Sequence, residues 1–538
     1  MPAAASVRPA GTMPSSPSSR AATPMLWICA REGKMQRSRR EMLSILAAAG
    51  GAAGLSGPAF GLLSTDPVLA AFEAAAASDP WTLGMADAPA EGRDAVAERL
   101  QGRLPSGLSG VLHRNGPARF TRNDWRYRHW FDGDGMVHAW RLTPGEPVTH
   151  QARFVETRKW LAEEDAGRFL MPTFGSVPPN SQGMRGPDDM NAANTSVMMI
   201  DGALMALWEG GSAWELDPDT LESRGAKVWG EGLSGLPFSA HPKTDPDGTI
   251  WNFGQAPMQD ALVIWHIGAD GQLRRADLVG DVPGGMIHDF AVTDRSLVFL
   301  VGNLMWDRAR LPYLDSFVWD DSRAMRVVAI DKADWSQRRV WDLPPGFLFH
   351  IGGAWEEADG AIRVDAALSD NARFATEGAR DAMRGHVRPE TDSTSRMRLI
   401  TLRPGGRFEQ AEFADSYAEF PQIDPRYTGL ERRFTWHVGW SDNQLQGASQ
   451  LVRRDLASGE TRRFDFGSDI VVEEPLFIPA SDRAREGEGW LVHTALNKRA
   501  RASELHVFDA RRVDDGPVGS WRLPYANPYG FHGCWRSL

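Results

Sequence analysis

Residues 195–219 read TSVMMI, DG, ALMALW, EGGS, AWEL and DPD, and this pattern recurs along most of the chain. Three apolar runs, 195–200, 203–208 and 213–216, are each followed by turn-forming residues. These are Asp201-Gly202, Glu209-Gly210-Gly211 and Asp217-Pro218-Asp219. Runs of about five residues bounded by turn-forming residues are typical of short strands joined by tight turns. The stretch therefore predicts an antiparallel meander of three strands.

Similar short runs follow throughout the later part of the chain, while long helical patterns are nearly absent after residue 170. The runs are 249–253, 262–267, 296–301, 326–330, 362–366, 398–402, 489–494 and 505–508. A long chain of short strands has to close on itself or repeat radially, because open sheets leave unpaired edges. The pattern predicts an all-β fold and favours a β-propeller, although it shows no strict repeat that would count the blades.

The amino-acid composition argues against several classes of binding partner and metal site. The formal net charge of -11 argues against a nucleic-acid partner, because such binding depends on Lys and Arg neutralising phosphates. With only two cysteines, Cys29 and Cys534, no disulfide framework and no thiolate metal site is expected. Hydrophobic residues at 42% and charged residues at 24% are typical of a soluble globular protein.

The N-terminal region looks like a targeting segment. Residues 1–34 have no apolar periodicity, Met35 is an alternative initiator, and paired arginines, Arg39 and Arg40, precede an uncharged Ala/Gly/Leu run that ends near Leu63. This order is similar to a twin-arginine export signal. We therefore expect residues 1–63 to be a disordered start and signal for export to a bacterial periplasm, and residues 64–538 to be the functional domain. The alternative is an ordinary basic turn in a cytoplasmic protein.

Four of the thirteen histidines stand in distinctive surroundings. A lone histidine is more often a core or surface residue than a metal ligand, so context separates these four. They are His241 in SAHPKTDP, His288 in MIHDF, His350 in FHIGGAWEE and His532 in YGFHG.

These segments, in this order and with these separations, resemble the iron-ligand segments of the carotenoid cleavage oxygenases. Further similar segments are HRNGP (113–117), WFDGDGM (130–136), ANT (193–195), EFPQI (419–423) and EPLF (474–477). The resemblance extends from about residue 80 to the C-terminus. It implies a seven-bladed β-propeller with a cap of loops and helices over one axial Fe(2+) ion, held by the catalytic ligands His241, His288, His350 and His532.

The resemblance also implies that three glutamates orient the imidazoles, Glu209 with His288, Glu419 with His350 and Glu474 with His532. Metal-binding imidazoles generally need such a partner on the second ring nitrogen. For each glutamate the plain alternative is a solvated strand end.

The implied activity is oxidative cleavage of a conjugated C=C bond of a carotenoid or apocarotenoid to carbonyl products, with dioxygen as cosubstrate. Four neutral imidazoles differ from the common two-histidine, one-carboxylate iron site. Because a conjugated olefin can supply electrons, no oxoacid or external reductant is expected. Because such a substrate is very apolar, we also expect peripheral membrane contact through an apolar patch. Residues 170–174 and 311–314 are the candidates for this patch.

Other readings stay open at this point. One branch of the resembling family cleaves hydroxylated stilbenes, using a lysine and a tyrosine to bind the phenol, and Lys159 and Tyr127 are the candidates here. The alternative for Lys159 is a lysine on a helix surface. Two further alternatives are a non-oxygenative isomerase-hydrolase on the same metal frame and a metal-free propeller that serves as a binding module.

Overall fold

The computed structural model describes residues 66–88, 94–388, 395–413, 417–440 and 447–538. The predicted export signal, residues 1–63, lies outside the described residues and stays a prediction. Within the described residues, no helix combines the length and the apolar character needed to cross a membrane.

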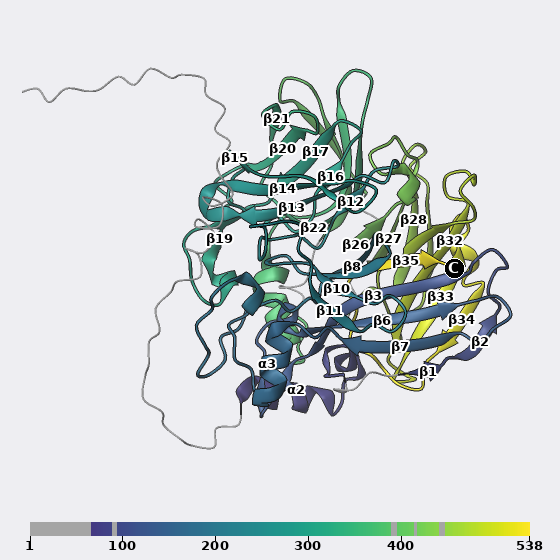
Figure 1. The fold of residues 1–538 in the computed structure, drawn as a ribbon. Coiled ribbons are helices and arrows are strands. Elements are labelled where there is room, and N and C mark those ends of the chain that lie inside the picture. The colour runs from purple at the N-terminus through teal and green to yellow at the C-terminus, as the bar shows by residue number, and fades with distance from the viewer. Residues whose placement is uncertain (1–65, 89–93, 389–394, 414–416, 441–446) are drawn as a thin grey trace, which may run out of the picture. The chain divides into compact units, whose positions relative to one another are not determined.

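Seven large sheets form the blades of a β-propeller, which confirms the predicted fold class (Figure 1). Five blades are each built from one stretch of the chain; four of them contain consecutive strands, and blade 4 is interrupted by two strands that form a small separate sheet. Blade 2 contains β8 (Ser196–Ile200), β9 (Ala203–Leu207), β10 (Trp214–Leu216) and β11 (Ser223–Ala226); blade 3 β12 (Lys243–Thr244), β13 (Ile250–Ala256), β14 (Ala261–Ile267) and β15 (Leu273–Gly280); blade 4 β16 (Ala291–Val292), β17 (Ser296–Val301), β20 (Met325–Asp331) and β21 (Arg338–Leu343); blade 5 β22 (Phe347–Glu356), β23 (Ile362–Ser369), β24 (Arg396–Leu402) and β25 (Phe408–Glu412); and blade 6 β26 (Tyr417–Gln422), β27 (Phe434–Trp440), β28 (Gln450–Asp455) and β29 (Thr461–Asp465).

The other two blades combine strands from both ends of the chain, which closes the ring. Blade 1 has the order β1 (Ala95–Val96), β7 (Thr149–Phe154), β6 (Asp134–Leu142), β3 (Gly110–Arg119) and β35 (Gly533–Ser537). Blade 7 has the order β2 (Glu98–Gly102), β34 (Gly519–Arg522), β33 (Ala502–Asp509), β32 (Gly489–Asn497) and β30 (Ile470–Val472), with β31 (Leu476–Pro479) also paired to β32. Purple and yellow strands accordingly meet in Figure 1.

The stretch 195–219 forms the meander that its pattern predicts. Ile200 pairs with Ala203 across a two-residue loop in which Asp201 and Gly202 have φ values of 48° and 75°. Such a turn needs positive φ at both positions, which Asp and Gly tolerate better than most residues. Alternation then places Leu204 and Ala206 of β9 in the apolar layer between blades 1 and 2.

The hydrophobic core lies between neighbouring blades rather than at one centre. Between blades 4 and 5, for example, Val327 and Trp341 pack with Ile362 and Val364. Between blades 6 and 7, Trp436 stacks on Phe477 with ring centroids 4.7 Å apart. Each blade therefore depends on both neighbours for its burial, which is why ring closure matters for stability.

Helices and short segments cover the propeller. They are α2 (Pro67–Ala76), α3 (Arg158–Ala166), α4 (Ala379–Ala382) after the π-turn η7 (Phe374–Gly378), and the 3-10 turns η2 (Pro80–Met85), η3 (Trp130–Asp132), η4 (Pro187–Asp189), η5 (Pro257–Gln259), η6 (Tyr313–Ser316), η8 (Pro425–Tyr427) and η9 (Val513–Asp515), with the two-stranded sheets β4 (Thr121–Arg122) with β5 (Trp125–Arg126) and β18 (Leu304–Trp306) with β19 (Phe317–Trp319). Phe72 of α2 and Trp81 of η2 pack with Ala382 of α4 and Leu496 of β32. These cap segments thus join blade 7.

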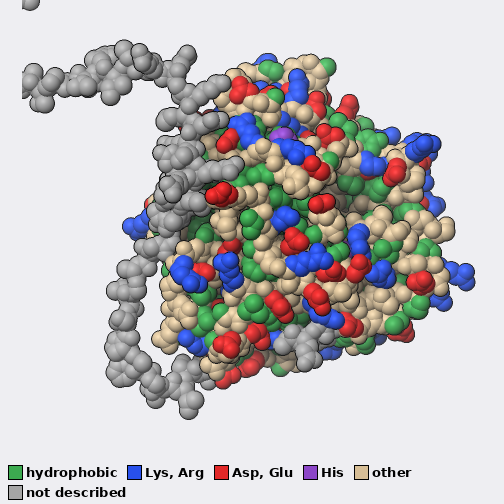
Figure 2. Space-filling model, viewed as in Figure 1, with side chains coloured by type: hydrophobic (Ala, Val, Ile, Leu, Met, Phe, Trp, Pro, Cys, Tyr) green, Lys and Arg blue, Asp and Glu red, His purple; other side chains and the backbone are tan. Residues whose placement is uncertain are grey.

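On the face shown in Figure 2, basic and acidic side chains are interspersed rather than gathered by sign. Exposed ion pairs occur along the described chain, such as Arg326 with Asp342 and Arg403 with Glu409. Exposed pairs of this kind contribute little to stability, so the interfaces between blades carry most of it.

A chain that ends at residue 532 should unfold at a clearly lower temperature than the full chain. It lacks β35, whose five pairings with β3 extend from Gly110 to Arg114, and β3 would become an exposed edge. The measurement is the thermal unfolding midpoint at a fixed scan rate. The control lacks Leu538 alone, which lies outside β35. Equal midpoints for all three chains would show that β35 does not stabilise the ring.

Candidate metal centre

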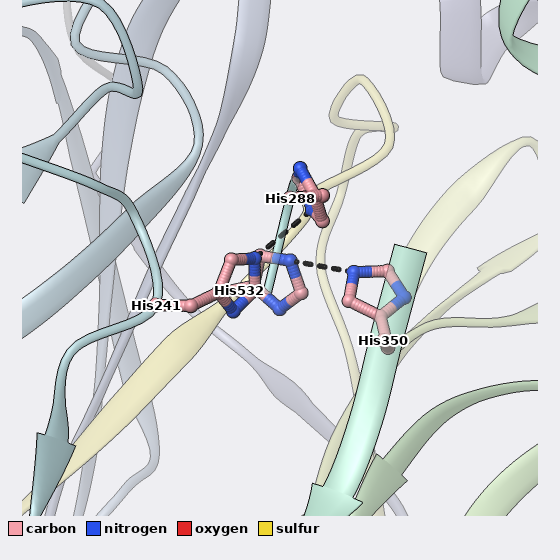
Figure 3. A group of neighbouring side chains, drawn as sticks. All are labelled: His241, His288, His350 and His532. Carbon is pink, nitrogen blue, oxygen red and sulfur yellow. Dashed lines mark hydrogen bonds between the residues drawn. The ribbon is translucent and has the colours of Figure 1, made fainter. Parts of the chain in front are cut away.

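Four histidines meet at the centre of the propeller, and each lies in or just before an edge strand of a different blade. His241 precedes β12, His288 precedes β16, His350 lies in β22, and His532 directly precedes β35. Their ligand nitrogens all lie within 4.8 Å of one another. The Nε2 atoms of His241 and His288 are 3.0 Å apart, and those of His350 and His532 are 3.1 Å apart (Figure 3).

Three carboxylates bind the opposite ring nitrogens, in the pairing expected from the sequence. Glu419 Oε2 is 2.6 Å from His350 Nδ1, and Glu474 Oε1 is 2.7 Å from His532 Nδ1. Glu209 Oε1 forms an ion-pair contact with His288 Nδ1.

When Nδ1–H donates to a carboxylate, the proton is fixed there and Nε2 keeps its lone pair. The carboxylates therefore orient the Nε2 atoms of three imidazoles toward a common point.

Burial keeps the centre largely uncharged. Desolvation and the neighbouring imidazoles lower the pKa of His241 and of His532 well below the usual value. Burial also acts against charge on His288, but the Glu209 carboxylate outweighs it and raises the pKa of His288. Neutral imidazole is the form that binds a metal ion.

Asp289 and Lys243 complete the centre around His241, and sequence reasoning missed both. Asp289 Oδ1 is 2.7 Å from Lys243 Nζ and 3.8 Å from His241 Nδ1, while Oδ2 accepts the Ile351 N–H at 2.9 Å. One buried carboxylate thus joins the segments that carry three of the histidines. Their positions in the sequence could have marked them as candidates, because Asp289 directly follows His288 and Lys243 is two residues after His241.

Arg114 and Gln422 support the fourth histidine. Arg114 is 2% exposed and donates to the carbonyl oxygens of Glu474 and Phe531 at 2.7 and 2.9 Å. Gln422 donates to Glu474 Oε1 at 2.9 Å. Burial raises the pKa of Glu474 to about 7, and nearby Arg114 works against that rise.

A divalent transition metal fits this set of donors. Unprotonated Nε2 atoms face one another at separations where only a shared cation or proton relieves the repulsion of their lone pairs. All-imidazole sites suit zinc, copper, iron and nickel, whereas calcium and magnesium prefer oxygen ligands. Among the residues that the structure describes, these four form the one His/Cys/Asp/Glu group with metal-binding geometry.

A cavity of about 430 Å³ opens beside the histidines. His288, His350 and His532 form part of its wall. Many aromatic side chains contribute to the rest, including Trp130, Phe131, Phe174, Trp306, Phe349 and Phe531. Met258 and Leu311, at 44% and 41% exposure, also line it, so the cavity reaches the surface. This size and this wall suit an apolar small molecule.

The structure does not bring Lys159 and Tyr127 into this cavity, which corrects their expected role as phenol ligands. Lys159 Nζ lies 2.5 Å from Asp134 and 2.8 Å from Glu163, and 5.3 Å from the Tyr127 ring centroid. Burial alone would lower the pKa of Lys159, but the two carboxylates outweigh it and raise that pKa. Burial raises the pKa of Tyr127 well above its usual value. Lys159 therefore belongs to a buried ionic cluster, whereas Tyr127 packs beside it with Phe120 and Phe169 in an apolar cluster.

The alternative reading of Lys159 also needs correction. Lys159 lies in helix α3 as that reading held, but its side chain is fully buried rather than on a helix surface. The helix turns this side chain inward because Asp134 of β6 and Glu163 one turn later are there to neutralise it.

Asp132 fixes one wall of the cavity. Its carboxylate accepts hydrogen bonds from the Ser176 hydroxyl at 2.5 Å and the Gly175 N–H at 2.8 Å. These bonds tie η3, with Trp130 and Phe131, to the loop that carries Phe174. Burial raises the pKa of Asp132 to about 6, against the effect of the Ser176 hydrogen bond.

Comparisons with known proteins agree with this geometry. The family model described as retinal pigment epithelial membrane protein matches residues 85–537. The chain is 28% identical to the apocarotenoid-15,15'-oxygenase of Synechocystis over 85% of this chain and 96% of that protein. It is 26% identical to lignostilbene-α,β-dioxygenase isozyme III of Sphingomonas paucimobilis over 82% and 94%. The crystal structure of the cobalt-substituted Synechocystis oxygenase superposes with a TM-score of 0.78 at 25% identity, covering 85% and 98%.

Replacing Asp132 with Asn should flatten the pH dependence of stability between about pH 4 and pH 6. In that window the folded chain holds a proton on Asp132 that the unfolded chain has released. The free energy of unfolding therefore falls as the pH rises, by up to about 3 kcal/mol. Thermal unfolding midpoints across the window measure this. Relative to the wild type, the variant should gain stability as the pH rises, and a constant difference would contradict the assignment.

Proposed function

Since this chain belongs to the carotenoid cleavage oxygenase family, we propose that it is a non-haem iron(II) dioxygenase that cleaves a conjugated C=C bond of a carotenoid or apocarotenoid to carbonyl products. The observation that carries the proposal is the convergence of four Nε2 atoms within 4.8 Å at the wall of an apolar cavity. A metal-free binding module would not need three carboxylates aligned behind three inward-facing imidazoles.

His241, His288, His350 and His532 would hold the iron, which supplies the site of dioxygen activation when bound. The chain's own residues do the rest. Glu209, Glu419 and Glu474 keep protons on Nδ1 and fix the rings.

Trp130, Phe131 and Phe531 form an apolar wall that excludes water and holds the double bond against the centre. A dry, prearranged site favours reaction over side reactions with water.

The apolar wall supports a long hydrocarbon substrate, as does the likeness to an apocarotenoid oxygenase. A stilbenoid substrate is the second candidate, supported by the likeness to a lignostilbene dioxygenase. It no longer draws support from Lys159 and Tyr127, which are buried elsewhere. An isomerase-hydrolase on the same frame is separated from both by whether labelled oxygen enters the product.

The proposal includes peripheral contact with a membrane, because a very apolar substrate has to be delivered to the cavity. Met258 and Leu311 are exposed at the cavity and would contact a membrane surface peripherally. Residue 311 belongs to one of the two segments named for this role from the sequence. We further propose periplasmic export through the signal at residues 1–63, which detection of the mature protein in a periplasmic fraction would test.

Changes around His288 should reduce iron binding in a graded way. His288→Ala should abolish iron retention, because one of four ligands is lost. Glu209→Gln should weaken iron affinity by roughly ten- to a hundredfold, because the ring loses its anionic partner. The measurement is competition with a coloured iron(II) chelator, and Glu215→Gln on β10 serves as the control. If Glu209→Gln bound iron as tightly as that control, Glu209 would have no orienting role.

Turnover tests the activity directly. Iron-loaded protein is incubated in air with an apocarotenal and, in parallel, with a 4-hydroxystilbene, and aldehyde products are identified by mass. We expect aldehydes and oxygen consumption with the apocarotenal. Aldehydes from the stilbene alone would select the second candidate. Absence of oxygen consumption with every polyene and stilbene would refute a dioxygenase function.

A further inference from the structure

One carboxyl group in the cavity wall has no part in the metal centre. Glu209 and Glu419, which also line the cavity, are bound to His288 and His350. Asn194 donates to the Phe131 and Gly133 carbonyls. Glu473 also lines the cavity but contacts none of the four histidines.

The backbone turns Glu473 and its neighbour in different directions. Both residues lie between β30 and β31, and their side chains bind different groups. Glu474 reaches His532, whereas Glu473 Oε1 accepts the Gly530 N–H at 3.0 Å and Oε2 accepts the Thr494 hydroxyl. Glu473 therefore stands close to the metal centre without serving it.

Each oxygen of Glu473 has one protein donor, and this leaves hydrogen-bonding capacity unused. A carboxylate offers about four acceptor positions, and a carboxylic acid offers a donor as well. Burial raises the pKa of Glu473, opposed by nearby Arg114. Either protonation state can bind a hydroxyl group, which is both donor and acceptor.

Placing the Glu473 carboxyl group in an apolar part of the cavity wall costs free energy. Val438, Ala448, Val471, Val472 and Phe531 line the cavity together with Glu473. An incompletely bonded carboxyl among apolar side chains loses hydration without full compensation, and a ligand hydroxyl would reduce that loss. Leu at the same place would pack with this wall, so the carboxyl calls for a polar ligand.

We propose that Glu473 is a specificity-determining residue that binds a hydroxyl group of the substrate, so that hydroxylated polyenes or hydroxylated stilbenoids are preferred over their unsubstituted counterparts. This rests on the proposed function, because it assigns the substrate class of the same cavity. The substrate hydroxyl would lie in the cavity beside the turn at Gly530. Gly530 is two residues before His532.

A purely structural role is the competing explanation. Glu473 supports the turn at Gly530, where an added Cβ would lie 2.6 Å from the Arg114 side chain. Loss of that support would displace His532, reduce iron content and impair all substrates equally. The test therefore compares matched substrates and measures iron in every variant.

The probes are two pairs, an apocarotenal with its 3-hydroxy derivative and stilbene with 4-hydroxystilbene. Dissociation constants are measured without oxygen from quenching of tryptophan fluorescence, since Trp130, Trp208 and Trp306 line the cavity. Values of kcat/KM are measured in air. We expect the wild type to prefer the hydroxylated member of one pair by at least about tenfold, and that pair identifies the source of the hydroxyl.

Glu473→Leu should reduce the ratio of kcat/KM between the hydroxylated and the unsubstituted substrate to about one, while the iron content stays unchanged. Glu473→Gln can still form a hydrogen bond with a hydroxyl group, so it should retain part of the preference. Tyr313→Phe is the matched control, since it removes another polar group of the cavity wall and should leave the preference intact.

Three results would overturn the proposal: no preference in the wild type, equal impairment of both members by Glu473→Leu, or loss of the preference in Tyr313→Phe instead. If the iron-loaded wild type turned over neither pair, the proposed function would fail, while the anaerobic dissociation constants would still measure the hydroxyl preference.

Discussion

The central constraint on this protein is that four imidazoles must present Nε2 to one point. Nothing in a single blade can satisfy it, because the histidines come from blades 1, 3, 4 and 5. Their Nε2 atoms repel unless a cation lies between them, so the surrounding structure has to hold them together against that repulsion. Interfaces between blades supply the rigidity, and the carboxylates behind the rings supply the direction.

The polar groups behind the histidines form a continuous network inside an apolar protein. Asp289 links the segments of His241, His288 and His350, and Arg114 with Gln422 secures Glu474. Each buried charge here has a partner, as the cost of burying an unpaired charge requires. The same rule accounts for Lys159, whose charge is neutralised by two carboxylates rather than offered to a ligand. Glu473 also has a donor for each oxygen, but part of its hydrogen-bonding capacity remains unused.

Local pattern was sufficient to predict much of this architecture. The runs at 195–200 and 203–208 became β8 and β9 because alternation and an Asp-Gly turn act over a few residues. The places of His350 and Glu419 followed from segment resemblance. Lys159 could not be placed, because its environment depends on how α3 packs against β6. Asp289 and Glu473 were missed for a related reason: a carboxylate's role depends on which groups the fold brings to it, and a position beside a histidine or a glutamate only marks it as a candidate.

The position of His532 has a consequence for how the protein is made. The five residues directly after it form β35, the strand that pairs with β3 and closes the ring. His532 is 182 residues beyond His350 in the chain, so the fourth ligand is absent while the ribosome makes blade 6 and most of blade 7. Until His532 is added, the metal centre is incomplete. A stop codon before that position yields a chain with at most three of the four ligands, so a complete centre shows that synthesis has passed His532.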